Sequence, residues 1–197
     1  MKGQPGPLSP DVAVASLYQE YLVTRHTGRA VRLSIERLVD ERSGPSLTVI
    51  DFHEVAVIDF SCADEVVARL LFDTLSRPTH AARHYFVLDG IEEGHMDPVS
   101  SALERRGLAV AARTAELRPV LLGQVEAEAR SVWEALSLAG RAGAVDLAAS
   151  MDGDPADCAR CLDRLDERRL VRGAGEVYAS LFSFLTLGDS GLGLGSR

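Results

Sequence analysis

Apolar residues along this chain recur at two different spacings, and their alternation predicts strands that are followed by helices. Residues 47–52 form a nearly continuous apolar run after a Ser-Gly-Pro-Ser turn, a pattern typical of a strand covered on both faces. Near Ser61 the spacing becomes helical and continues to about residue 75. The apolar stripe of this helix consists of Ala63, Val66, Val67, Leu70, Leu71 and Leu75. We expect Asp64 and Glu65 to lie mostly outside the stripe.

Strand and helix signals alternate through the first 122 residues. Helices are predicted at residues 9–22, 27–41 and 99–106, and further strands at residues 85–88, 108–112 and 117–122. Ser9 and Pro10 define the start of the first helix as its N-cap and first helical residue, and Asp97-Pro98 defines the start of the third. Strands that alternate with helices favour a mixed or parallel sheet with right-handed crossovers.

Beyond Gly123 the pattern changes to three helices and a hairpin. The helices are predicted at residues 125–139, 144–151 and 154–168, and the hairpin strands at 170–172 and 176–181. This order is that of a winged helix. We therefore predict an α/β domain with a central mixed sheet at residues 8–122 and a small winged-helix (α+β) domain at residues 124–183. A flexible tail rich in Gly and Ser is expected at residues 188–197.

Composition narrows the classes of function. The net charge of -8 argues against a general nucleic-acid coat and against a protein that binds anionic membranes, because both need a basic surface. The three cysteines have no disulfide-framework spacing, which indicates a reducing compartment. No apolar run approaches the roughly 20 residues of a membrane span. We expect a cytoplasmic protein that does not bind membranes.

Candidate catalytic residues are few. The chain contains no phosphate-binding loop, nucleophile elbow or His-Glu-x-x-His motif. Cys158 and Cys161 have the spacing of a redox or zinc pair, but they lie inside an amphipathic helix, so we expect them in the core. An enzyme would require Asp51, His53 and Asp59 to gather around a pocket. We therefore predict a non-enzymatic protein with no cofactor and no metal.

Ser61 has two interpretations. With Asp64 three residues later it fits a capping box, in which Ser61 is the N-cap of the predicted helix. At an exposed helix start it is also a candidate phosphoacceptor, because backbone N–H groups and the helix dipole stabilise added negative charge. The nearby carboxylates of Asp59, Asp64 and Glu65 would oppose that charge. The residues alone therefore favour the cap.

Residues 47–71 resemble the central strand, loop and helix of a STAS domain, the fold of sulphate-transporter tails and anti-sigma-factor antagonists. The family's Ile-Asp pair corresponds to residues 58–59, and Ser61 falls at the family's phosphorylatable position. Phe60 and Cys62 stand where the family has a hydroxyl residue and a glycine. The resemblance implies a regulatory domain controlled by phosphorylation.

A closer resemblance is to the STAS-like family of unknown function, whose helix opens with the Ala-Asp-Glu found here at residues 63–65. It covers roughly residues 20–115. Members of that family often accompany histidine-kinase-like ATPases or helix-turn-helix domains, which implies signalling rather than catalysis. We expect Asp59, Asp64 and Glu65 to dock a protein partner, either a kinase-like ATPase or a second copy of the chain in a homodimer.

The C-terminal part resembles winged helix-turn-helix repressor domains, with residues 161–165 in the recognition helix. Arg160, Arg164 and Arg168 follow each other at intervals of four on that helix and are candidates to contact DNA phosphates or a guanine edge. Arg172 is a candidate contact from the wing. The same helix carries five acidic residues, namely Asp154, Asp157, Asp163, Asp166 and Glu167. Surface charge pairing on a helix used for protein contacts is the alternative.

Two functions are consistent with these patterns. The first is a non-enzymatic regulatory protein of a bacterial-type signalling or transcription-control pathway, which docks a protein partner through its STAS-like domain. The alternative is a DNA-binding winged-helix transcription regulator, in which the STAS-like domain serves as a sensor or a dimerisation module. The net charge of the chain weighs slightly against DNA.

Overall fold

A five-stranded mixed sheet forms the centre of the molecule. The computed structural model describes residues 10–76 and 83–185. The strands of the sheet, in spatial order, are β1 (Asp11–Ser16), β3 (Ser46–Asp51), β5 (His84–Ile91), β6 (Ala109–Thr114) and β7 (Pro119–Gly123). The first four are parallel, and β7 runs antiparallel to β6 at one edge. The predicted α/β class and mixed central sheet are therefore confirmed.

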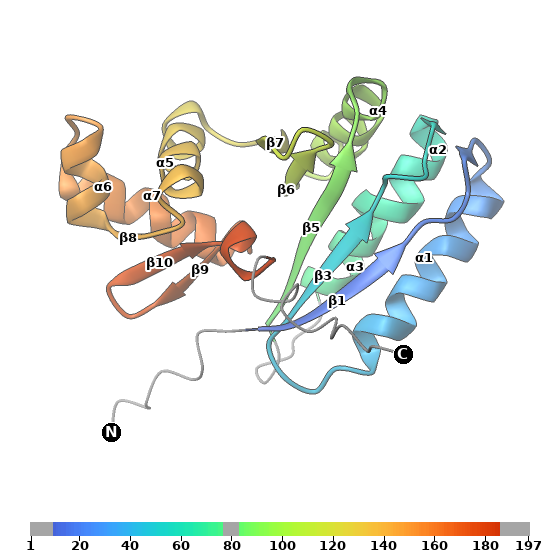
Figure 1. Ribbon diagram of the computed structural model, residues 1–197, viewed down its shortest axis with the longest axis horizontal. Helices are drawn as coiled ribbons and strands as arrows, with labels where there is room; N and C mark the ends of the chain where they lie inside the picture. Colours follow the sequence, from blue (N-terminus) through green and yellow to red (C-terminus); the bar gives the residue numbers. More distant parts are fainter. Residues whose placement is uncertain (1–9, 77–82, 186–197) are drawn as a thin grey trace, which may run out of the picture.

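One face of the sheet is covered by a layer of helices (Figure 1). The layer consists of α1 (Arg25–Asp40), α2 (Phe60–Ala63), the π-helical turn η1 (Asp64–Arg69), α3 (Leu70–Leu75) and α4 (Glu93–Glu104). Two short strands, β2 (Tyr21–Leu22) and β4 (Val57–Ile58), pair in parallel and form a small sheet of their own. Ile50, Leu88 and Val110 of the sheet pack with Val66 and Val99 of the helices in one apolar core. Of the helices in the described part of the chain, none is long and apolar enough to span a bilayer.

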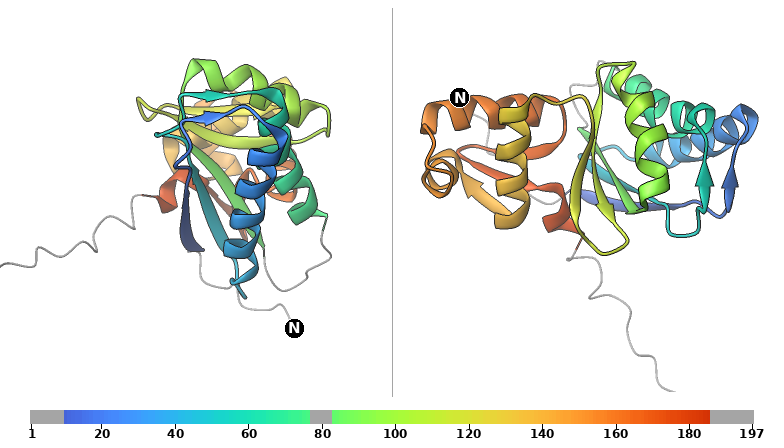
Figure 2. Two further views of the ribbon diagram at one scale, coloured as in Figure 1. Left: turned by 90° about the vertical axis from the view of Figure 1, so that its right-hand side faces the viewer. Right: turned by 90° about the horizontal axis from the view of Figure 1, so that it is seen from above.

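The C-terminal part of the chain covers the opposite face. Its elements are α5 (Ala127–Ala139), β8 (Arg141–Gly143), α6 (Ala144–Ser150), α7 (Pro155–Glu167), β9 (Val171–Ala174), β10 (Val177–Ser180) and the 3-10 turn η2 (Leu181–Phe184). The three strands form an antiparallel sheet in the order β8-β10-β9, and β8 has no counterpart in the sequence prediction. Leu47, Tyr85 and Val87 of the central sheet share a second core with Trp133 and Leu165. Seen from above, the central sheet lies between the two covering layers (Figure 2).

The helix predicted at residues 9–22 is wrong, because β1 and β2 occupy most of this range. β1 pairs with β3, and the backbone N–H of Asp11 donates to the carbonyl of Pro45 at 3.0 Å. Its Asp-Val-Ala-Val-Ala-Ser sequence presents β-branched residues at alternate positions, which suits a strand once a neighbour is available. The proposed N-cap Ser9 and the tail at residues 188–197 lie outside the described residues.

The helix α4 begins four residues before the predicted Asp97-Pro98 start. Glu92 and the side chain of His95 cap the helix reciprocally, and the Nδ1 atom of His95 accepts from the Glu92 backbone N–H at 3.2 Å. Pro98 therefore lies inside the helix, where it removes one backbone hydrogen bond. Neither Glu at the N-cap nor His at the third helical position is among the usual sequence signals of a helix start, which explains the error.

Close approach of α1 to α2 and η1 depends on Gly28. A Cβ atom at this position would lie 3.0 Å from the Cα of Cys62 and 3.2 Å from the Cβ of Glu65. We predict that Gly28→Ala lowers the free energy of unfolding by about 1–3 kcal/mol, because the helices must separate. Urea denaturation measures the change.

Gly94→Ala is the matched control, because Gly94 lies in α4 and a Cβ there would have no neighbour within 4 Å. This substitution should leave the stability unchanged or raise it by up to about 1 kcal/mol. Equal stability of Gly28→Ala and the wild type would contradict the role given to the glycine.

Candidate functional site

Asp59 begins the helical segment that follows β4. Its carboxylate accepts from the backbone N–H of Cys62 at 2.8 Å and from the hydroxyl of Ser61 at 2.9 Å. Asp59 is therefore the N-cap, and the predicted capping box with Ser61 as N-cap is wrong. The backbone of Asp59 is extended, so its carboxylate can reach the backbone N–H groups of the first helical turn, which have no partner within the helix. Ser61 already lies within that first turn. The Ser61 hydroxyl is half-buried, and its role as a phosphoacceptor stays a prediction.

Asp64 and Glu65 were expected to lie mostly outside the apolar stripe, but both side chains are buried. They are 9% and 2% exposed, because α1 passes over η1 and supplies arginines to both. Arg106 donates to Asp64 at 2.8 Å, and Glu65 accepts from Arg25 at 3.0 Å and from Arg32 at 3.2 Å. Two buried carboxylates require such partners, because removing an unpaired charge from water costs several kcal/mol of folding free energy. Any docking role of these two acids would therefore act through the arginines that cover them.

The exposed Arg105 and the partly buried Arg106 lie over aromatic rings beside this network. The guanidinium of Arg105 is 4.6 Å from the centre of the Phe60 ring, and that of Arg106 is 5.8 Å from the Phe72 ring. Phe72 is 45% exposed although it is a large aromatic residue. We call Phe60, Ser61, Phe72, Arg105 and Arg106 the arginine–aromatic patch. Sequence reasoning overlooked it, and the one available signal was Phe72, an aromatic residue outside the apolar stripe.

A polar row crosses the second face of the central sheet where the parallel strands end. Asp51 accepts from the backbone N–H of His53 at 3.0 Å and pairs with the His53 ring at 2.6 Å. Arg113 binds both carboxylate oxygens of Asp89, at 2.7 and 2.6 Å. Gly90 lets the His53 ring approach, because a Cβ there would lie 2.6 Å from the ring Nδ1. The structure thus brings Asp51 and His53 together, whereas the contacts of Asp59 are with Ser61 and Cys62.

Hydrogen bonding lowers the pKa of Asp51. Partial burial acts to raise this pKa, but the backbone and ring of His53 outweigh it, so the pKa lies below its ordinary value of 3.8. A lowered carboxylate pKa stabilises the folded state above the unfolded pKa, and the contribution is lost as pH falls through the folded pKa.

We predict that Asp51→Asn is less stable than the wild type at neutral pH and that the difference closes under acid. The difference should be complete above about pH 4 and should shrink as pH falls through the lowered pKa of Asp51. Thermal unfolding of both proteins across this range measures it. A difference that stays constant down to about pH 2 would contradict the prediction.

The four candidate DNA-binding arginines do not form one surface. Arg160 pairs with Asp157, and Arg164 is exposed. Arg168 donates to the carbonyls of Gly107 and Gln124, at 3.2 and 2.6 Å, on either side of β6 and β7. Arg172 is buried, with its guanidinium 5.7 Å from the centre of the Tyr85 ring. The last two arginines are thus occupied in holding the C-terminal part against the sheet.

We predict that Arg168→Ala lowers the free energy of unfolding by about 1–3 kcal/mol, because two carbonyl contacts of a charged donor are lost. Arg164→Ala is the matched control on the same helix and should change stability by less than about 0.5 kcal/mol. Chemical denaturation distinguishes them. Equal effects of the two substitutions would mean that the Arg168 contacts contribute little.

The cysteines show no sign of reactivity. Cys62, Cys158 and Cys161 are free and buried, as expected for core residues. Burial raises the pKa of Cys62 and of Cys158, so the nucleophilic thiolate is disfavoured at both. Within residues 10–76 and 83–185, no group of three or more His, Cys, Asp or Glu side chains is placed to hold a metal ion.

Comparisons with known proteins add no assignment. No model of a known protein family matches the chain, and no curated protein matches it.

Proposed function

We propose that the chain is a non-enzymatic regulatory protein that binds a protein partner through the arginine–aromatic patch. The observation that carries this proposal is the pairing of Arg105 and Arg106, which follow the last residue of α4, with Phe60 of α2 and Phe72 of α3. Aromatic residues and arginine are the types enriched at protein interfaces and at their energetic centres. Arg25 and Arg69 add exposed positive charge nearby through their pairs with the buried Glu65. A partner with an acidic surface and an apolar recess fits this chemistry.

Regulation of this contact is proposed at Ser61. Phosphorylation would add a charge of about -1.5 to -2 within the patch. The new charge would be repelled by Asp59, which now accepts the Ser61 hydroxyl, and attracted by neighbouring arginines such as Arg105. The added negative charge would offset the positive charge of the patch and weaken its attraction for an acidic partner. The resemblance of residues 47–71 to STAS domains supports a switch at this position in a cytoplasmic signalling or transcription-control pathway.

The C-terminal part is proposed to be a winged-helix module that serves as a structural cover rather than as a DNA reader. Its element order, α5-β8-α6-α7-β9-β10, is compatible with that fold. Arg168 and Arg172 are occupied against the central sheet, and Asp154 and Asp157 stand at the start of α7. A recognition helix with this charge would repel DNA phosphates, which supports the protein partner over the DNA alternative.

The test is affinity purification from cell lysate with the wild type, Phe72→Ala and Arg105→Glu as baits, compared by quantitative mass spectrometry. We expect one protein to be enriched by the wild type and its affinity to fall roughly tenfold or more in both variants, because aromatic and arginine anchors dominate interface energies. The control is Val145→Ala, which alters an exposed apolar residue on α6. Circular dichroism verifies that each bait is folded.

Two outcomes would count against the proposal. In the first, no enriched protein depends on the patch. In the second, the chain binds duplex DNA at low salt, with a steep salt dependence that Arg160→Ala and Arg164→Ala reduce. That result would favour the transcription regulator. Fluorescence anisotropy with a labelled duplex of mixed sequence measures it.

A further inference from the structure

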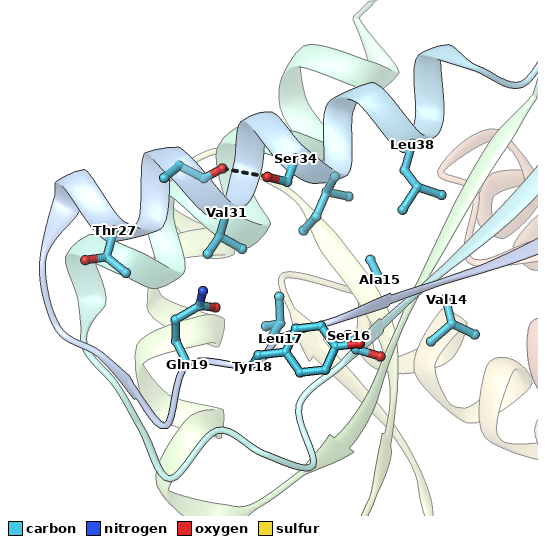
Figure 3. Close-up of a pocket in the computed structure, with 12 residues that line it drawn as sticks. Val14, Ala15, Ser16, Leu17, Tyr18, Gln19, Thr27, Val31, Ser34 and Leu38 are labelled. Carbon is cyan, nitrogen blue, oxygen red and sulfur yellow. Dashed lines mark hydrogen bonds between the residues drawn. The ribbon is translucent and has the colours of Figure 1, made fainter.

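An uncharged groove of about 510 Å³ lies between α1 and β1. Figure 3 shows side chains from both elements turned toward this space, with Val31 on the helix and Gln19 after the strand on opposite sides. The described lining residues are Val14, Ala15, Ser16, Leu17, Tyr18, Gln19, Thr27, Ala30, Val31, Ser34, Ile35 and Leu38. None of them carries a charge, although a quarter of the chain is charged. The α1–β1 groove is therefore unlike the mixed-charge surface of the arginine–aromatic patch.

The open edge of β1 borders this groove. Among the residues that the structure describes, only β3 pairs with β1. The backbone N–H groups of Asp11 and Leu17 donate toward β3, at 3.0 and 3.1 Å. Backbone groups of a strand alternate in direction, so Val12, Val14 and Ser16 direct their N–H and C=O groups to the open edge. β1 has no Lys, no Pro and no bulge, which are usual devices that protect an edge from another strand. Its one charged residue, Asp11, lies at the end of the strand and pairs with Arg42.

The side chains around the edge are suited to close contact. Val14 is 57% exposed and Tyr18 is 82% exposed, so an apolar surface flanks the free backbone groups. On α1, the small residues Ala30 and Ser34 are exposed one turn apart. The Ser34 hydroxyl donates to the Ala30 carbonyl at 3.2 Å and needs no outside partner. Another helix can therefore approach α1 closely along this line.

We propose that a second copy of the chain pairs with this edge, β1 against β1 in the antiparallel direction. The three outward-facing residues are symmetric about Val14, so Val14 meets Val14 of the second copy and Val12 meets Ser16 of the second copy. Each opposed pair exchanges two N–H···O bonds. The two α1 helices then lie next to each other and cover both grooves. The central sheet becomes continuous through a twofold axis at Val14.

The symmetry of the open edge about Val14 favours a second copy as the occupant, because the same edge can then pair with itself. Two molecules with a net charge of -8 repel each other, so their contact must exclude acidic groups. The groove meets this condition, and the symmetric register makes the surface self-complementary, as a twofold interface requires. This interface goes beyond the proposed function and uses a different surface, which leaves the arginine–aromatic patch open for its own partner.

Sedimentation analysis of the full chain between about 1 and 100 µM tests the proposal. We expect the wild type to form dimers, and both Val14→Lys and Val14→Glu to weaken dimerisation by roughly tenfold or more, because like charges would then face each other across the axis. An equimolar mixture of the two variants should dimerise again, since Lys would face Glu. Leu138→Lys changes a residue on α5 that is 86% exposed and should dimerise like the wild type.

Hydrogen exchange provides a second measurement. The amides of Val12, Val14 and Ser16 should become protected as the concentration rises, while Arg105→Glu should leave this protection unchanged. Three results would overturn the proposal: a monomeric wild type over the whole range, a dimer insensitive to charges at Val14, or no recovery in the mixture. A monomer whose groove takes up a neutral peptide or small molecule instead would also overturn it.

Discussion

A largely parallel sheet must be covered on both of its faces, and this requirement governs the arrangement of the whole chain. The helical layer of α1 to α4 covers one face, and the C-terminal part covers the other with Trp133 and Leu165. The indole N–H of Trp133 donates to the carbonyl of Leu170 at 3.2 Å, so even this large side chain is satisfied in the second core. Tyr85 and Leu47 of the sheet would otherwise face water.

Covering the sheet determines which charged residues remain for function. Arg83 pairs with Asp166 at 2.6 Å and Arg168 binds carbonyls that flank β6 and β7, so these groups hold the C-terminal part in place. An arginine occupied in this way contributes nothing to a phosphate-binding surface. On the helical layer, the exposed Arg105 lies over Phe60, and the partly buried Arg106 lies over Phe72 while it pairs with Asp64.

The arginine–aromatic patch and the buried ion pairs of Asp64 and Glu65 share residues and depend on each other. Arg106 contacts both the buried Asp64, at 2.8 Å, and the ring of Phe72. Glu65 is held by three arginines, and Gly28 allows α1 to come close enough to supply two of them. Because the carboxylates are neutralised beneath the surface, the groups presented to a partner are guanidinium groups and aromatic rings. Asp64 and Glu65, two of the three acids predicted to dock a partner, therefore lie beneath the patch and hold its arginines.

Local periodicity in the sequence determined most elements correctly. The strand at residues 47–52, the helix at 27–41 and the helices and hairpin after Gly123 all follow from the spacing of apolar residues, which each element carries within itself. Only the tertiary structure decided that residues 11–16 form an edge strand, that Asp64 and Glu65 are buried, and that Arg168 holds the C-terminal part. These outcomes depend on neighbours distant in the chain: β3 for the strand, α1 for the acids, and β6 with β7 for the arginine. Spacing along a chain records which side chains avoid water, but not which element will cover them.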